Sequence, residues 1–87
     1  MENIVGTRIY EDDVYYVEAG YQDDKDAFLV LVGKRSGSGN HCHFTIKEDG
    51  TVINERHRGI CEECGQQSPS KDECVELLKE AILERRI

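Results

Sequence analysis

The longest apolar run in this sequence has only six residues, from Ala27 to Val32. A membrane-spanning helix needs about 20 apolar residues, so this run is far too short to cross a bilayer. Apolar residues at consecutive positions lie on both faces of a strand, whereas a strand with one solvated face alternates apolar and polar residues. Residues 27–35 are therefore predicted to form the central strand of a sheet.

Four further segments have the composition of strands, because they are rich in β-branched and aromatic residues or alternate in polarity. Asp49-Gly50 is a typical two-residue hairpin turn, and it separates the last two of them. The four segments are residues 4–10, 14–19, 41–47 and 51–58.

The C-terminal segment is predicted to be a helix. Ser70 followed by Glu73 has the spacing of a capping box, and apolar residues recur at helical spacing after it. The expected fold class is α+β: an antiparallel meander of about five strands, with one C-terminal helix packed on one face. With 87 residues the chain is expected to be a single domain, 1–87, with a sheet at 4–58, a Cys-x-x-Cys loop at 59–69 and the helix at 70–86.

The most specific short motif is Cys61-Glu62-Glu63-Cys64-Gly65. Two cysteines at this spacing are typical of structural zinc sites, which need four ligands in tetrahedral geometry. If Asp49-Gly50 forms a two-residue turn, Cys42 lies opposite His57, close to where Cys61 follows. The sequence therefore predicts one structural zinc ion, with His57 as a substitute ligand and four candidate thiols: Cys42, Cys61, Cys64 and Cys74.

Two alternatives for the cysteines remain open. Cys42 alternates with Phe44 and Ile46, and Cys74 lies on the apolar stripe of the helix, so both can be ordinary buried thiols. The Cys-x-x-Cys pair can also be a redox couple, although the usual strand-to-helix setting of such couples is absent.

Basic residues and histidines concentrate between Lys34 and Arg58. The same hairpin turn places His43 opposite Arg56, and a five-residue loop at 36–40 places Gly33 opposite His43. Arg35 then lies opposite His41, and His41 opposite Arg58. Alternate residues of a strand share a face, and arginine forks with histidines suit phosphate oxygens. The predicted anion-binding residues are Arg35, His41, His43, Arg56 and Arg58. The alternative is a solvated face whose charges pair with Glu48, Glu55 or the helix.

The leading interpretation is a small zinc-stabilised binding module whose cationic face takes a phosphate-bearing ligand or an acidic partner segment. No catalytic residues are predicted under this interpretation. One alternative is a phosphoryl-transfer or phosphodiester-cleaving enzyme using His41 and His43. The segment His43-Phe44-Thr45 resembles one of the two His-x-Thr motifs of two-histidine phosphoesterases, and this chain has a single copy. An 87-residue monomer has little room for a water-excluding cleft, which argues against the enzyme.

A second alternative is a single-stranded nucleic-acid binder. The formal charge of −7, from 18 acidic and 11 basic residues, disfavours both nucleic acid and anionic membranes as partners. One helix covers only one face of the sheet, so a homodimer is expected. The start of the chain, Met1-Glu2-Asn3-Ile4, lacks the basic and apolar parts of a signal peptide, so a cytoplasmic location is expected.

Overall fold

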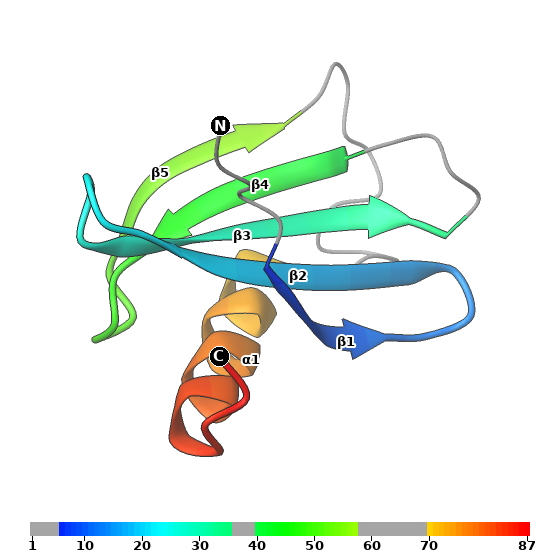
Figure 1. Ribbon diagram of the computed structural model, residues 1–87. Coiled ribbons are helices and arrows are strands. Elements are labelled where there is room, and N and C mark those ends of the chain that lie inside the picture. The colour runs from blue at the N-terminus through cyan, green and yellow to red at the C-terminus, as the bar shows by residue number, and fades with distance from the viewer. Residues whose placement is uncertain (1–5, 36–39, 58–69) are drawn as a thin grey trace.

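The computed structural model describes residues 6–35, 40–57 and 70–87. Within these residues, five strands form one sheet in the order β1-β2-β3-β4-β5, with neighbouring strands antiparallel, and one helix follows (Figure 1). This confirms the predicted α+β meander. The elements are β1 (Thr7–Glu11), β2 (Tyr15–Gln22), β3 (Ala27–Lys34), β4 (Asn40–Ile46), β5 (Val52–His57) and α1 (Lys71–Leu83).

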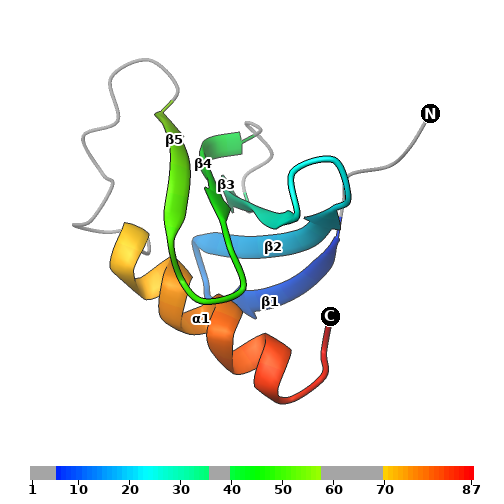
Figure 2. The same cartoon turned by 90° about the vertical axis from the view of Figure 1, so that its left-hand side faces the viewer.

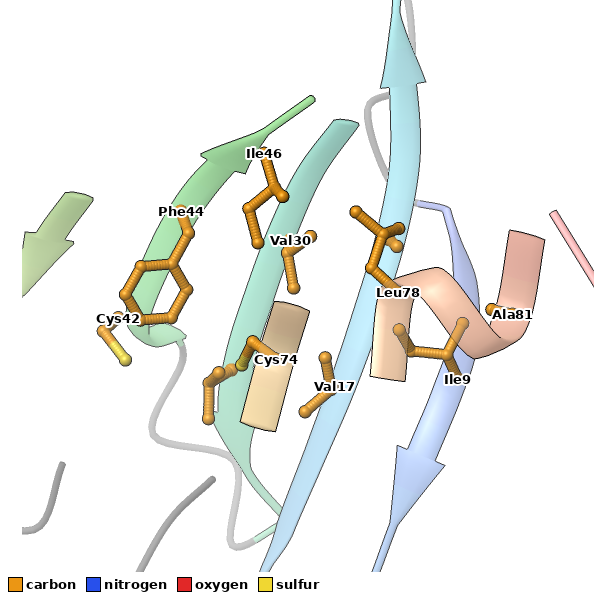
Figure 3. Packing of buried hydrophobic residues seen from close by; sticks show 11 residues of the cluster. Ile9, Val17, Val30, Cys42, Phe44, Ile46, Cys74, Leu78 and Ala81 are labelled. Atoms are coloured by element: carbon orange, nitrogen blue, oxygen red, sulfur yellow. The ribbon is translucent and has the colours of Figure 1, made fainter. Parts of the chain in front are cut away.

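The helix α1 lies along one face of the sheet (Figure 2). Alternate residues of β2, β3 and β4 point toward it and form the buried core, with Phe44 and Val30 as direct neighbours across β3 and β4. Leu78 and Cys74 of α1 pack onto this layer (Figure 3). Each of these four side chains is almost completely excluded from solvent, so the predicted central strand and the apolar stripe of the helix meet in one core.

The start of α1 follows the predicted capping box. The Ser70 hydroxyl accepts a hydrogen bond from the Glu73 backbone N–H at 3.2 Å, and the Glu73 carboxylate accepts one from the Ser70 N–H at 2.8 Å. These bonds satisfy two backbone donors that have no partner within the helix.

The helix ends earlier than predicted, at Leu83 instead of residue 86. Arg85 adopts a left-handed conformation with φ 60°. The backbone N–H of Arg86 then donates to the carbonyl of Ala81 at 2.8 Å, and that of Arg85 donates to Ile82 at 3.0 Å. This pattern closes a helix C-terminus, and it turns the chain back toward the sheet. There the Arg86 guanidinium donates to the carbonyl of Ile9 at 3.4 Å.

The turn between β4 and β5 differs from the predicted two-residue turn. The Gly50 N–H donates to the Lys47 carbonyl at 2.8 Å, and Gly50 has φ +97°, so the loop contains three residues and ends on a left-handed glycine. A second irregularity follows, because Thr45 pairs with Asn54 but Ile46 pairs with Val52. The two shifts cancel, so residues 42–45 of β4 pair with residues 54–57 of β5 in the predicted register.

The predicted register between β3 and β4 is wrong by two residues. His43 pairs with Leu31 instead of Gly33, and Gly33 pairs with Asn40. His41 is the extra residue at an irregularity in β4, so it does not lie opposite Arg35. The β3 strand ends at Lys34, and the backbone N–H of the next residue, Arg35, donates to the carbonyl of Val14 at 2.8 Å. Because the shift is an even number, it leaves His43 on the predicted face.

Candidate functional site

The face of the sheet opposite α1 carries one residue from each strand in a continuous row. The strand pairings bring five residues side by side, in the order Arg8, Glu18, Leu31, His43 and Arg56. The row begins with an ion pair, since the Arg8 Nη2 lies 2.9 Å from Glu18 Oε2. Leu31 of the central strand separates this pair from the histidine and the second arginine. Charge therefore changes along the row, which has its one acid, Glu18, on β2 and a cation at each end, Arg8 on β1 and Arg56 on β5.

His43 and Arg56 are direct neighbours across β4 and β5, as predicted. His43 is half-buried and Arg56 is exposed. Burial lowers the pKa of His43 below its ordinary value, and the positive charge of Arg56 lowers it further. Within the part of the chain that the structure describes, Arg56 makes no ion pair with an acidic residue. A neutral imidazole and an unpaired guanidinium thus lie side by side on the sheet surface.

Arg35 lies elsewhere, at the end of the sheet next to the β1–β2 turn. Its Nε lies 3.1 Å from Glu11 Oε2, and its Nη1 donates to the carbonyl of Asp12 at 3.1 Å. The alternative prediction was that the cations of this face pair with acidic residues. It holds for Arg35, although the partner is Glu11 and not Glu48 or Glu55. A hollow of about 560 Å³ lies beside it, lined by Asp13, Val14, Lys34 and Arg35.

Two of the five predicted anion-binding residues lie outside what the structure describes. Only the backbone of His41 is described, in β4, and Arg58 falls beyond the end of β5. The structure brings together His43 and Arg56, and it separates Arg35 from them.

Cys42 and Cys74 are both core residues, with 2% and 0% of their surfaces exposed. They come from β4 and α1 and belong to the same apolar layer (Figure 3). Burial, with a smaller contribution from the negative charge of Glu55, raises the pKa of Cys42 to about 11. Burial likewise raises the pKa of Cys74 to about 12, with a smaller contribution from Cys42. Both side chains are therefore neutral thiols at pH 7 in the metal-free protein.

The remaining predicted metal ligands, Cys61 and Cys64, lie outside the described residues, as does the side chain of His57. Among residues 6–35, 40–57 and 70–87, no three histidine, cysteine or acidic side chains gather as a metal site. The backbone does bring Cys42 opposite His57, as the hairpin arithmetic predicted.

Glu18 and Arg8 share a surface with His43, which was not predicted from the sequence. Glu18 alternates with the buried Val17 and Ala19, so its exposure on the face opposite the core could have been inferred. Its position in the row of His43 depends on the β2–β3 and β3–β4 registers, which no local pattern fixes.

The sequence matches no protein-family model, and comparisons with curated proteins and with solved structures found no match. In the described segments, no helix is long and apolar enough to span a membrane.

Proposed function

We propose that this protein is a small binding module whose sheet face, opposite α1, binds an anionic group through His43 and Arg56. The anion is the phosphate of a small ligand or a carboxylate of an acidic partner segment. The pairing of His43 with the exposed Arg56 is the observation that carries the proposal. Two neighbouring groups of potentially like charge are unfavourable unless they are solvated or share an anion.

The chemistry of the two side chains suits this task. The arginine guanidinium presents parallel N–H donors that match two oxygens of a phosphate or carboxylate. A neutral histidine adds one N–H donor, and an anion beside it raises its pKa and favours the second. Leu31 lies next to His43 on the same face and offers an apolar contact to the rest of the ligand.

The test is an NMR titration of the His43 ring with pyrophosphate, using His43→Gln to assign the signal. We expect the His43 pKa to rise when pyrophosphate binds, and the effect to weaken as salt is added. Arg56→Ala should reduce pyrophosphate affinity. Lys25→Ala is the matched control, because Lys25 is an exposed cation in the β2–β3 turn, outside the row.

A parallel titration with a hexaglutamate peptide separates the two anion sources. A His43 response to pyrophosphate alone identifies a phosphate site, and a response to the peptide alone identifies a carboxylate site. If neither probe moves the His43 signal, or if Lys25→Ala weakens binding as much as Arg56→Ala, the anion site is wrong.

We further propose that one structural zinc ion holds the segment between β5 and α1 to the core. Cys61 and Cys64 provide two ligands, and Cys42 and Cys74 provide the others, with His57 as a substitute. The topology supports this set. Segment 58–69 leaves β5 directly after His57, the partner of Cys42, and α1 begins one turn before Cys74. Both buried thiols therefore lie near the ends of the segment that carries the Cys-x-x-Cys motif.

Metal analysis of protein purified without chelators tests the zinc proposal. We expect one zinc per chain, and we expect Cys64→Ser to lose it while the sheet and helix remain folded, because they have their own core. Protein that contains no zinc, or Cys64→Ser protein that retains a full equivalent, would rule the site out.

A further inference from the structure

We infer that the acidic partner of this face is a second copy of the chain, bound face to face about a two-fold axis parallel to β3. The inference rests on the proposed function, because it identifies the carboxylate that His43 and Arg56 receive as Glu18 of the second copy. It follows from the order of charges across the sheet and from the central position of β3.

The three inner residues of the row, Glu18, Leu31 and His43, are self-complementary about its centre. Leu31 lies on β3, the middle strand, with Glu18 one strand away on β2 and His43 one strand away on β4. A two-fold axis above Leu31 and parallel to β3 exchanges the positions over β2 and β4. Glu18 of each copy then lies over His43 of the other, and Leu31 packs on Leu31. Because the same patch serves both copies, the assembly closes as a dimer.

Glu18 has the capacity to bond a second partner. Its side chain is 18% exposed, and both bonding nitrogens of Arg8, Nε at 3.3 Å and Nη2 at 2.9 Å, use the same oxygen, Oε2. Oε1 makes no hydrogen bond to any residue that the structure describes. An ionised carboxylate accepts about four hydrogen bonds, so Oε1 can accept from His43 or Arg56 of the other copy.

The outer ends of the row tolerate this arrangement. In the proposed dimer, Arg8 of one copy lies over Arg56 of the other, and two arginines without acidic partners would repel each other. Arg8, however, already contacts two carboxylates, Glu18 at 2.9 Å and Glu11 at 3.6 Å, and its guanidinium lies 4.1 Å from the centroid of the Tyr16 ring. Arg56 makes no ion pair with an acid that the structure describes, and Glu18 of the other copy lies only one strand away from it, over His43.

The apolar part of the face lies at the proposed axis. Leu31 and Leu29 are both partly exposed, and they occupy successive positions of β3 on the face that α1 does not cover. Five strands about 4.8 Å apart and about 20 Å long offer at most about 480 Å² per copy, because Thr45 on the same face is already buried within the chain. A dimer would then bury at most about 960 Å² in total, below the range of stable interfaces, so we expect a weak dimer that dissociates on dilution.

The experiment is sedimentation equilibrium of the full chain over a roughly hundredfold dilution series, with charge-altered variants. The wild-type protein should change from dimer to monomer as it is diluted. Glu18→Lys places a lysine over His43 and beside Arg56, and His43→Glu places a glutamate directly under Glu18, so each variant alone should weaken dimerisation at least about tenfold. Glu76→Lys is the control, because Glu76 is exposed on α1, which packs on the other face of the sheet, and it should leave dimerisation unchanged.

Mixing the Glu18→Lys and His43→Glu variants is the decisive arm. In a mixed dimer, Glu18 of the His43→Glu chain lies over His43 of the other chain, as in the wild type, and the introduced lysine lies over the introduced glutamate. We expect heterodimers of about wild-type affinity, a result that unfolded variants could not produce. Equal dimerisation of the wild type and both variants, or no rescue on mixing, would show that another surface is used.

The outcomes separate this inference from the proposed function. A wild-type chain that stays monomeric while His43 still responds to pyrophosphate overturns the dimer and leaves the anion site in place. Dimerisation that follows the charge pattern, without any response to pyrophosphate or hexaglutamate, supports the dimer and removes the free-ligand role.

Discussion

The ring of Tyr16 lies over Gly33, its direct partner across β2 and β3. A Cβ added to Gly33 would come within 2.5 Å of the ring Cζ and Oη atoms, closer than any real contact. The missing side chain therefore leaves the space that the tyrosine fills. The Arg8 guanidinium stacks over the Tyr16 ring and forms an ion pair with Glu18.

Gly33→Ala should destabilise the protein, because the added methyl group forces the Tyr16 ring to move. Overpacking of this kind costs about 1–3 kcal/mol in the free energy of unfolding, measured by urea denaturation. Tyr16→Ala is the matched background. Without the Tyr16 ring, the methyl group that Gly33→Ala adds has free space, so the substitution should cost little there. An equal loss from Gly33→Ala in both backgrounds would mean that the Tyr16 ring is not the obstacle.

Ser70→Ala should lower the free energy of unfolding by about 1 kcal/mol, because the helix loses the acceptor of its first-turn N–H. The Ser70 and Glu73 side chains cap each other's backbone, so Ser70→Ala and Glu73→Ala should combine non-additively in a double-mutant cycle. Glu76→Ala, one turn further on and exposed, is expected to change stability little. A neutral Ser70→Ala variant in urea denaturation would contradict the capping role.

Leu78→Ala should lower the free energy of unfolding by about 2–5 kcal/mol. Leu78 is 0% exposed, so its truncation leaves a cavity between α1 and the sheet. Leu83→Ala is the matched control in the same helix. Leu83 is 82% exposed, so its truncation should change the free energy of unfolding by less than about 0.5 kcal/mol. Similar losses in the two variants would show that α1 does not pack through the face that carries Leu78.

The stability contributed by His43 should fall as the solution is acidified. The pKa of His43 is lower in the folded chain than in the unfolded chain, where it is about 6.5. The neutral form is therefore favoured by folding, and its contribution is complete above pH about 6.5 and is lost as pH falls through the folded pKa. The difference in free energy of unfolding between the wild type and His43→Gln should shrink over that interval in phosphate-free buffer. A difference that grows as pH falls would mean that a nearby acid outweighs burial and Arg56 in setting the pKa of His43.

Local patterns were enough to predict the elements and most of the fold class. The apolar run at 27–32 identified the central strand, and the Ser70–Glu73 spacing located the start of α1 to within one residue. Both signals arise within a few neighbouring residues, because side-chain alternation and helix capping are properties of short segments. The pairing of Cys42 with His57 was also predicted, although it survives only because the three-residue turn and the bulge near Ile53 cancel.

The sequence by itself determined, from the alternation of residues in β4 and β5, that His43 and Arg56 share one side of the sheet. Only the tertiary structure decided which residues on that side become neighbours. In the folded chain His43 pairs with Leu31 and not with Gly33. Arg35 forms an ion pair with Glu11 at the β1–β2 end, and Glu18 lies in the same row as His43. The physical reason is that the face of a side chain repeats every two residues along one strand. Register instead depends on backbone pairing across loops, and a two-residue slip changes every neighbour while leaving every face unchanged.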